Sequence, residues 1–343
     1  MEWLQAVAPT HALQPGSLHI ASADASFRRY FRIHATVAGA PVCRIIMDAP
    51  PDKENSQPFV DIAHLMASLG LHVPQVLEWQ REHGFLLLSD LGRQTMMQLI
   101  NPDGVARPFA EALPLYQQAV DALLPWQLGS RAGVLPPYDE ALMRRELELF
   151  PEWYVHQHRG VAINAAMRKV LDTSFALIIQ RCLAWPSVFV HRDFMPRNLM
   201  VPALAGQPLG VLDFQDAVYG PITYDVASLM RDAFLSWDEE NVLDVTIRYW
   251  ERARRVGLPV GDDFGAFYAG VEWMGLQRHL KVAGIFARLT LRDGKPRYLA
   301  DAPRFIRYIT ATCHRYAELK PLLRLIEELE GLQPVTGFAY GRM

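Results

Sequence analysis

Five residues near the middle of the chain have the types and the spacing of a catalytic site. An apolar run leads into the triplet His191-Arg192-Asp193, Asn198 follows five residues after that aspartate, and a second apolar run leads into Asp213. Transfer of a phosphoryl group from ATP requires a carboxylate that orients the attacking hydroxyl group and accepts its proton, together with oxygen ligands that hold Mg²⁺ against the phosphates. We therefore predict that Asp193 is the catalytic base and that Asn198 and Asp213 are metal ligands.

The joint pattern is far more specific than any of its parts. A His-Arg-Asp triplet alone occurs in many loops, but here the pattern H-x-D-x(4)-N is followed, at the distance of a short hairpin, by two apolar residues and the pair Asp213-Phe214. The alternative explanation is two strand ends that carry solvated aspartates and a capping asparagine. The combination favours a kinase-type catalytic loop.

Two longer strings extend this pattern. Residues 189–200 read FVHRDFMPRNLM, and residues 212–232 read LDFQDAVYGPITYDVASLMRD. The loop resembles that of the aminoglycoside/choline phosphotransferase branch of the protein-kinase-like superfamily, in which HxDxxxxN and hhDF/W mark the site. Within that branch, both strings are similar to the family of anomeric kinases of N-acetylmuramate and N-acetylglucosamine, which act in bacterial cell-wall recycling. The similarity extends over most of the chain.

The resemblance implies a fold, a division into lobes and a reaction. The fold would be α+β and bilobal, with a small N-terminal β-sheet lobe that binds nucleotide (residues 1–91) and a larger, mostly helical C-terminal lobe for catalysis and acceptor binding (residues 92–343). The reaction would be ATP- and Mg²⁺-dependent phosphorylation of the C1 hydroxyl of one or both amino sugars. Because a fold alone does not set the substrate, a kinase acting on an aminoglycoside, choline or homoserine is one alternative. A pseudokinase that binds nucleotide without catalysis is another.

Composition excludes several other classes of function. Half of the 343 residues are hydrophobic, enough for a large core shared by two lobes, and the net charge is −3. So small a charge gives no argument for nucleic-acid binding or for electrostatic attachment to a membrane, and no protein partner is inferred. Cys43, Cys182 and Cys313 are odd in number and widely spaced, as expected for thiols in a reducing compartment. We find no signal peptide and no membrane-spanning run, so we expect a cytoplasmic protein.

A loop that enters a strand follows the first turn of the chain. Small residues lead into an alternating aromatic and basic run, which predicts this arrangement. In a kinase-like fold, the hairpin loop that covers the nucleotide phosphates lies here. The loop has no glycine, but Ser22, Ala25 and Ser26 would also let the backbone approach a phosphate, and Arg28 or Arg29 could add positive charge. An ordinary β-hairpin with solvated arginines is the alternative.

The strand expected over residues 41–48 would carry the basic residue that pairs with the phosphates. Arg44 and Met47 occupy two possible registers of this strand, and Lys53 follows the next turn. We favour Arg44, although a slip of one residue would turn its side chain to the other face of the sheet.

A helix is expected over residues 58–70, because the apolar residues have helical spacing and the run ends at a glycine. A carboxylate near this helix would pair with the basic residue of the strand. Glu54 and Asp61 are the candidates, and a solvated carboxylate is the interpretation that we favour for either of them.

Two strands are expected over residues 73–77 and 84–92, and the second leads directly into a glycine. This is the expected form of a hinge between lobes. Adenine would be held there mainly by backbone N–H and C=O groups close to Leu88 and Asp90. A buried core strand explains the same run, and the two interpretations are compatible.

Helical apolar spacing dominates the rest of the chain. It predicts helices over residues 110–124, 139–150 and 163–184, and a further helix that begins at Tyr224. The resemblance implies that Asp225 accepts hydrogen bonds from the catalytic loop and holds that loop in place. A plain helix N-cap is the alternative.

One segment in the final third carries polar residues that we associate with acceptor binding. Within the helical pattern of residues 272–289, the side chains of Gln277, Arg278, His279 and Lys281 fall within little more than one turn, beside an apolar face. In related phosphotransferases this region helps to form the acceptor pocket, which implies Arg278 and His279 as substrate residues. A solvated helix face is the alternative.

Basic residues also flank the predicted base. Arg192 and Arg197 lie in the catalytic loop, and we predict Arg197 as a further substrate residue. Basic walls suit a neutral or anionic acceptor better than a cationic one. N-acetylmuramate fits this requirement, because an arginine could bind its lactyl carboxylate in a bidentate manner.

Overall fold

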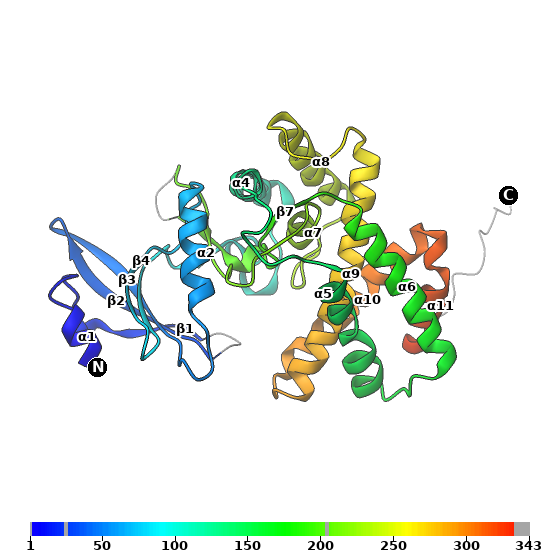
Figure 1. Cartoon of the computed structure of the whole chain (residues 1–343), viewed down its shortest axis with the longest axis horizontal. Coiled ribbons are helices and arrows are strands. Elements are labelled where there is room, and N and C mark those ends of the chain that lie inside the picture. Colours follow the sequence, from blue (N-terminus) through cyan, green and yellow to red (C-terminus); the bar gives the residue numbers. More distant parts are fainter. Residues whose placement is uncertain (1, 24–26, 203–205, 333–343) are drawn as a thin grey trace. The chain divides into compact units, whose positions relative to one another are not determined.

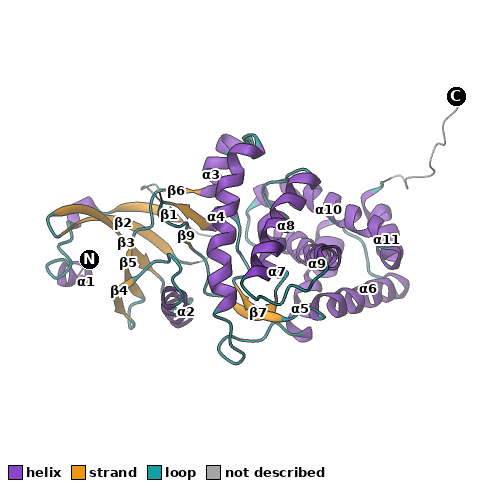
Figure 2. Ribbon diagram, turned by 90° about the horizontal axis from the view of Figure 1, so that it is seen from above, coloured by secondary structure: helices purple, strands orange, loops and turns teal. Residues whose placement is uncertain are grey.

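The computed structural model describes residues 2–23, 27–202 and 206–332. The chain divides into two compact units, each built from two stretches of sequence. Unit 1 consists of Met1–Gly129 and His191–Ala217, and unit 2 consists of Ser130–Val190 and Val218–Met343. A small antiparallel sheet and a larger set of helices confirm the predicted α+β class (Figures 1 and 2). The lobe boundary that we place after residue 91 stays a prediction.

A five-stranded antiparallel sheet forms the N-terminal part of unit 1, with α2 (Gln57–Ser68) beside it (Figures 1 and 2). The strand order is β1-β2-β3-β5-β4. The two-residue turn Ala38-Gly39 joins β2 to β3 with φ values of 50° and 79°, and such turns match the twist of the strands they connect. The strands are β1 (His19–Ala23), β2 (Arg29–Val37), β3 (Ala40–Asp48), β4 (Val76–Gln80) and β5 (Phe85–Ser89).

One face of this sheet packs against α1 (Glu2–Val7). Successive side chains of a strand point to opposite faces, so the other face carries the buried side chains of Met47, Leu86 and Leu88. The cluster under α1 consists of Leu4, Ala8, Leu13, Ile33, Ala35, Ile46 and Leu87.

The rest of unit 1 contains a second, three-stranded sheet of order β6-β8-β9. Helix α3 begins with a capping box, in which the Thr95 hydroxyl accepts from the backbone N–H of Gln98 while the Gln98 side chain accepts from the N–H of Thr95. The elements are β6 (Gln94–Thr95), α3 (Met96–Ile100), α4 (Phe109–Leu128), β8 (Leu199–Val201), β9 (Gly210–Val211) and the 3₁₀ turns η1 (Pro15–Ser17), η2 (Pro102–Gly104) and η4 (Pro196–Asn198).

Unit 2 is organised around one long helix, α9 (Phe264–Leu291), which lies in the middle of a group of helices (Figure 2). Strands β7 (Ser187–Val190) and β10 (Val218–Pro221) pair antiparallel. The remaining helices are α5 (Glu140–Leu147), α6 (Ala165–Leu183), α7 (Tyr224–Met230), α8 (Glu239–Arg255), α10 (Ala302–Arg315) and α11 (Lys320–Glu330). The described part of the unit also contains a π-helix, η3 (Phe150–His158), and the 3₁₀ helices η5 (Pro296–Asp301) and η6 (Ala317–Leu319).

The helices predicted from apolar spacing are confirmed, with small shifts at their ends. They correspond to α2, α4, α5 and α6. The exception is the end of the helix predicted over residues 139–150, where α5 stops at Leu147 and the π-helix η3 begins at Phe150. The buried residues of η3 recur at a spacing that also fits an α-helix, so the sequence did not indicate a π-helix; they are Phe150, Pro151, Tyr154 and Val155. Within the described ranges, no helix combines the length and the apolar character that a membrane crossing requires.

The polar side chains on the central part of α9 are buried. Gln277, Arg278, His279 and Lys281 are all 6% exposed or less. The alternative of a solvated helix face is therefore wrong. Polar groups at such positions must find partners inside the protein, because burial without a hydrogen bond or an ion pair is costly.

Lys281 and Glu146 form a buried ion pair in this interior, at 3.5 Å. The Lys281 ammonium also donates to the Tyr224 hydroxyl at 2.8 Å. The Glu146 carboxylate accepts from the Tyr138 hydroxyl and, at 3.1 Å, from the Gln277 amide. These contacts join α9 to α5 and to the start of α7.

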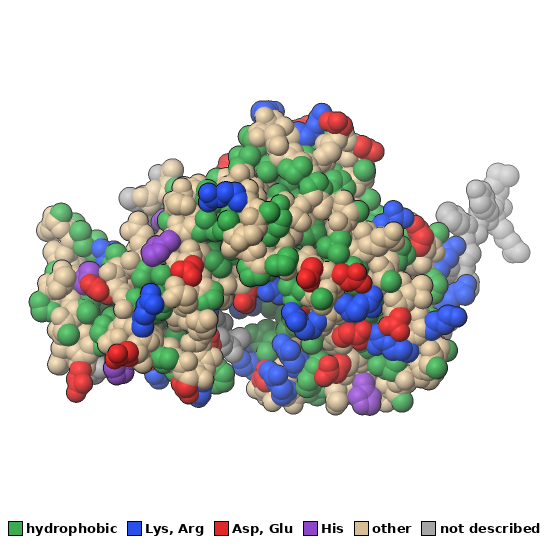
Figure 3. All heavy atoms as spheres, in the orientation of Figure 1, with side chains coloured by type: hydrophobic (Ala, Val, Ile, Leu, Met, Phe, Trp, Pro, Cys, Tyr) green, Lys and Arg blue, Asp and Glu red, His purple; other side chains and the backbone are tan. Residues whose placement is uncertain are grey.

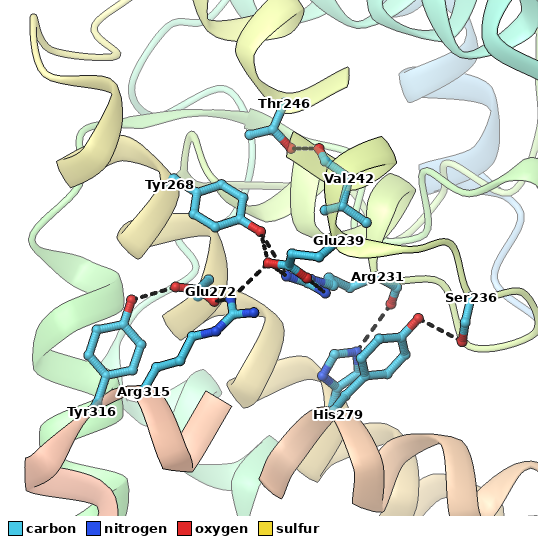
Figure 4. A network of polar contacts seen from close by, with 11 residues as sticks. Arg231, Ser236, Glu239, Val242, Thr246, Tyr268, Glu272, His279, Arg315 and Tyr316 are labelled. Carbon is cyan, nitrogen blue, oxygen red and sulfur yellow. Dashed lines mark hydrogen bonds and ion pairs between the residues drawn. The ribbon is translucent and has the colours of Figure 1, made fainter. Parts of the chain in front are cut away.

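A second polar network joins the ends of α7, α8 and α10 to α9 (Figure 4). Arg231 donates to both carboxylate oxygens of Glu239, at 2.9 and 3.0 Å, and the Tyr268 hydroxyl and Arg315 donate to the same carboxylate. Arg315 also pairs with Glu272. Burial by itself would raise the pKa of Glu239, but the hydrogen bonds from these donors lower it to about 2. Glu239 thus stays charged and connects four helices.

His279 extends this network. One ring nitrogen, Nε2, donates to the backbone oxygen of Arg231 at 3.2 Å (Figure 4). The ring stacks on Tyr308 with centroids 4.4 Å apart. Complete burial, together with the nearby charges of Arg231 and Arg278, lowers the pKa of His279 to about 3. The imidazole is therefore neutral at physiological pH and serves as a packed, hydrogen-bonded element of the fold.

Gly284 provides a test of the packing of α9. A Cβ at this position would lie 2.3 Å from the backbone oxygen of Leu149, at the start of η3. We expect Gly284→Ala to lower the free energy of unfolding by about 1–3 kcal/mol, because neither backbone can yield easily. Gly275 on the same helix is the matched control, since its nearest neighbours are side-chain atoms at 3.6 and 3.8 Å. Gly275→Ala should leave stability unchanged or raise it by up to about 1 kcal/mol in urea unfolding, and equal effects of the two changes would contradict this account.

The buried imidazole predicts how stability depends on pH. Between the ordinary histidine pKa and the folded value of about 3, only the unfolded chain binds the extra proton, so the folded state loses stability as pH falls. His279→Gln keeps an N–H donor but does not titrate. We expect wild type to have the higher free energy of unfolding, by an amount that is constant above about pH 7.5. Between about pH 6 and pH 4 this advantage should shrink by up to about 1.4 kcal/mol per pH unit. Urea unfolding at a series of pH values measures this difference, and parallel curves would refute the burial of a neutral ring.

Candidate active site

The three catalytic residues predicted from the sequence meet in unit 1. The Asn198 amide nitrogen donates to the backbone oxygen of Asp193 at 2.8 Å and to Oδ2 of Asp213 at 3.3 Å. All three residues are half-buried. One amide therefore links the backbone of the predicted base to the carboxylate of the predicted metal ligand.

A short hairpin brings Asn198 and Asp213 to the same place. Leu199 pairs with Val211 across β8 and β9, and the N–H of Leu212 donates to the carbonyl of Asn198 at 2.9 Å. Because this pairing fixes the register, the residue before β8 faces the residues that follow β9. Apolar side chains at Leu199 and Val211 are fully buried and hold the hairpin in the core.

His191 attaches the beginning of the catalytic loop to the same hairpin. The N–H of Asp193 donates to Nδ1 of His191 at 3.2 Å. The ring must then carry its proton on Nε2, which donates to the carbonyl of Leu212 at 3.0 Å. The imidazole is fully buried. It therefore joins the backbone of the predicted base to the residue that precedes Asp213.

Two residues of the site have a left-handed backbone. The φ angle is 76° at Arg192 and 64° at Asp213. For residues other than glycine, this conformation costs about 1–2 kcal/mol, so the surrounding hydrogen bonds must maintain it. Backbone strain of this kind concentrates at functional sites.

Residues on both sides of Asp213 are tied to the N-terminal part of unit 1. The fully buried ring of Phe214 stacks on Phe59 of α2, with centroids 5.0 Å apart. The N–H of Val211 donates to the carbonyl of His72 at 2.8 Å. These contacts fix the position of the Asp213 backbone from two directions.

The donor set fits a divalent cation such as Mg²⁺. This ion prefers oxygen ligands and is commonly held by one or two carboxylates. Because the Asn198 amide donates through Nδ2 to two oxygen acceptors, its Oδ1 is the atom that would bind a cation, and the carboxylate of Asp213 would be the second ligand. In a phosphotransferase such an ion supplies positive charge to the phosphates. No group of three or more His, Cys, Asp or Glu side chains that could form a different metal centre occurs among residues 2–23, 27–202 and 206–332.

The carboxylate of Asp193 makes no hydrogen bond or ion pair with the described residues, although both backbone polar groups of this residue are engaged. A half-buried carboxylate of this kind is available to accept a proton from a hydroxyl group. The geometry is therefore compatible with the predicted role of Asp193.

The predicted phosphate-covering loop lies only partly within the described residues. Ser22 belongs to β1, whereas Ala25 and Ser26 lie outside the described ranges. The predicted contacts of these three residues with nucleotide stay predictions.

Arg28 follows this loop and is buried. It pairs with Glu54 at 3.2 Å, and the same carboxylate accepts from the N–H of Phe27 at 3.0 Å. Glu54 is only 13% exposed, so its interpretation as a solvated carboxylate is wrong, whereas Asp61 is exposed. Lys53 lies 4.8 Å from the centre of the Phe27 ring. The structure thus joins Arg28, rather than Arg44 or Lys53, to a carboxylate.

Arg44 lies on the sheet face that packs against α1. In the observed register it is opposite Ile33, and it shares this face with Ile46. It makes no hydrogen bond or ion pair with the described residues. Met47 points to the other face and is fully buried. This placement gives no support to our preference for Arg44 as the residue that pairs with the phosphates.

The predicted hinge residues end β5. Leu88 is buried within the strand. The Asp90 carboxylate accepts from Nε and Nη2 of Arg32, at 2.6 and 3.1 Å, and from the N–H of Gly92 at 3.0 Å. The hydrogen bond to Asp90 raises the pKa of Arg32. The Asp90 side chain thus fixes the end of the strand, and the proposed contact of nearby backbone groups with adenine stays a prediction.

The predicted substrate residues fall in different units. Arg197 is exposed in the catalytic loop of unit 1. Arg278 and His279 are buried in α9 of unit 2, with the Arg278 guanidinium 4.8 Å from the centre of the Tyr224 ring. Packing within unit 2 is enough to explain both buried residues, and their contact with an acceptor stays a prediction.

Sequence reasoning missed Gln215. Its amide nitrogen donates to Oδ1 of Asp213 at 2.9 Å. A glutamine two residues after an aspartate has no distinctive type or spacing, so only the structure identifies it.

The face of the molecule in Figure 3 shows acidic and basic side chains interspersed over unit 2, in agreement with the small net charge.

Comparisons with known proteins agree with this geometry. Residues 17–260 match the model of a phosphotransferase enzyme family. A Pseudomonas putida protein named N-acetylmuramate/N-acetylglucosamine kinase is 50% identical to the chain, and the match covers 92% of this chain and 89% of that protein. A Neisseria meningitidis protein of the same name is 47% identical, with 98% and 97% covered.

A solved structure of an aminoglycoside phosphotransferase, in ternary complex with streptomycin and ATP, has a TM-score of 0.56 at 14% identity and covers 89% of this chain and 97% of that one. At so low an identity the likeness concerns the fold, and it supports the predicted kinase-like architecture. Because the family model matches more than half of the residues and the relatives match nearly the whole chain, the chain belongs to the phosphotransferase enzyme family and groups with its members named N-acetylmuramate/N-acetylglucosamine kinase.

Proposed function

We propose that the protein transfers the γ-phosphoryl group of ATP to the anomeric C1 hydroxyl of N-acetylmuramate, N-acetylglucosamine or both, in the recycling of cell-wall sugars. The observation that carries the proposal is the arrangement of Asp193, Asn198 and Asp213, which one amide joins at 2.8 and 3.3 Å. The names of the relatives, which share about half of the residues, supply the acceptor.

Each of the three groups has one task in this reaction. Asp193 orients the acceptor hydroxyl and takes its proton as the oxygen attacks phosphorus. Asn198 and Asp213 hold Mg²⁺, which supplies positive charge to the phosphates when bound. The rest of the catalytic effect comes from positioning, which hydrogen bonds and buried packing around the loop provide.

Nucleotide binding is the proposed task of residues 1–91, and acceptor binding and catalysis are the proposed tasks of residues 92–343. Arg28 lies at the end of the predicted phosphate-covering loop, where Glu54 holds its guanidinium group in place, and contact of this group with the phosphates is part of the proposal. Backbone groups near Leu88 and Asp90 would receive adenine. We place the reaction in the cytoplasm, where ATP is available, because three unpaired thiols suit a reducing compartment.

Recognition of the acceptor rests on charge. Arg197 is exposed beside Asp193 in the catalytic loop. A positive side chain at this position favours a neutral or anionic sugar and disfavours a cationic aminoglycoside or choline. A guanidinium group could bind the lactyl carboxylate of N-acetylmuramate through two parallel hydrogen bonds.

Asp193→Asn tests the assignment of the base. The amide keeps the size of the side chain but cannot accept the proton, so we expect kcat to fall by about 10²–10⁴-fold while KM for ATP changes little. Steady-state kinetics with N-acetylglucosamine measures both constants, and thermal unfolding verifies that the variant is folded. Turnover close to that of wild type would remove Asp193 from this role.

A panel of acceptors tests the substrate class. We expect ATP consumption with N-acetylmuramate and N-acetylglucosamine and no consumption above background with kanamycin, choline or homoserine. For the cationic acceptors kanamycin and choline, the reason is the positive charge of the exposed Arg197. Phosphorus NMR of the products should show a phosphate on C1. Turnover of a cationic acceptor, or binding of Mg²⁺-ATP without turnover of any acceptor, would overturn the assignment.

A further inference from the structure

Both carboxylate oxygens of Asp213 accept hydrogen bonds from neutral amides. Oδ2 accepts from Asn198 at 3.3 Å, and Oδ1 accepts from the Gln215 amide nitrogen at 2.9 Å. The Asn198 contact belongs to the site described above, whereas Gln215 has no role in it. The shorter of the two contacts thus comes from a residue outside the predicted catalytic set.

Rigid structure supports both amides. Asn198 is held by its own backbone N–H, which donates to Met195 at 2.8 Å, and by its second amide contact, to Asp193. Gln215 directly follows Phe214, whose ring is fully buried. The left-handed backbone of Asp213, with φ of 64°, fixes the direction in which its side chain leaves the chain. Rotation of the Asp213 side chain is restrained by donors on both of its oxygens.

We propose that Gln215 is a positioning residue, which fixes the rotation of the Asp213 carboxylate before a divalent cation binds. The inference rests on the proposed function, because it takes Asp213 as a ligand of Mg²⁺. Groups that hydrogen-bond to metal ligands orient those ligands, and their loss typically weakens metal binding by about 10- to 100-fold. Gln215 would act in this way through its amide nitrogen.

The Gln215 amide carries no charge, and this matters for the protein before a cation binds. A carboxylate at position 215 would place a second negative charge at hydrogen-bond distance from Asp213 and would remove the donor. Like charges at such a distance repel strongly in a half-buried site, and a bound cation relieves that repulsion. An amide orients Asp213 without this cost to the cation-free protein.

Two substitutions separate orientation from charge. Gln215→Met keeps a long unbranched side chain and removes the donor, and Gln215→Glu removes the donor and adds a charge. Asp216→Asn is the matched control, because Asp216 is the neighbouring residue and is exposed, so the change alters local charge without touching Asp213. The readout is binding of ADP to the full chain by isothermal titration calorimetry at a series of Mg²⁺ concentrations, together with the thermal unfolding temperature with and without Mg²⁺.

For Gln215→Met we expect the Mg²⁺ concentration that gives half-maximal ADP affinity to rise about 10-fold or more, with the unfolding temperature in the absence of Mg²⁺ little changed. Asp216→Asn should leave the Mg²⁺ dependence within about twofold of wild type. A purely structural role for Gln215 would instead lower the unfolding temperature and leave the Mg²⁺ dependence unchanged. That result would overturn the proposal.

For Gln215→Glu we expect a lower unfolding temperature than for Gln215→Met without Mg²⁺, and a larger rise on addition of Mg²⁺ and ADP, because the cation neutralises the added charge. Equal unfolding temperatures of the two variants without Mg²⁺ would refute the argument from charge. These measurements need no acceptor. If no sugar is phosphorylated but Gln215→Met shifts the Mg²⁺ dependence of ADP binding, the proposed function fails and the positioning role stands. If a sugar is phosphorylated but Gln215→Met leaves the Mg²⁺ dependence unchanged, the positioning role alone is overturned.

Discussion

The amide of Asn198 makes the two hydrogen bonds on which the whole site depends. Through one nitrogen it reaches the backbone of Asp193 and the carboxylate of Asp213, two residues that lie twenty positions apart in the sequence. The β8–β9 hairpin and the ring of His191 hold the same two segments together through backbone groups. Because several short contacts enforce one arrangement, the site is largely formed before any ligand arrives. Such preorganisation is what phosphoryl transfer requires, since the protein contributes mainly positioning and charge.

Charged side chains between the helices of unit 2 are held in ion pairs. Lys281 pairs with Glu146, and Glu239 accepts from Arg231 and Arg315 (Figure 4). Glu146 accepts from two side chains of α9 and from Tyr138, which precedes α5, whereas the donors to Glu239 come from three different helices. Lys281 and Glu146 are each 7% exposed, so the loss of either partner would leave an uncompensated buried charge, which is far more costly than the loss of an exposed ion pair. The polar side chains of α9 therefore specify which helices surround it.

The sequence predicted the catalytic loop and the major helices because their signals are local. Spacing within one hairpin identified Asn198, and apolar periodicity identified helices such as α6. The remaining features depend on residues far apart in the chain. The pairing of Arg28 with Glu54 and the burial of His279 beside Arg231 leave no trace in any single window of sequence. The face to which Arg44 points follows from its register with β2, and no pattern within one strand determines that register.

The three thiols differ in a way that has practical value. Cys182 and Cys313 are buried in the helices of unit 2, and burial raises the pKa of both, to about 12 for Cys313. Only the thiolate reacts with alkylating reagents, so these two sulfur atoms are inert in the folded protein. Cys43 in β3 is partly exposed. A maleimide dye would therefore attach at one known position in the sheet, without any engineered mutation, and its emission would report changes in that sheet.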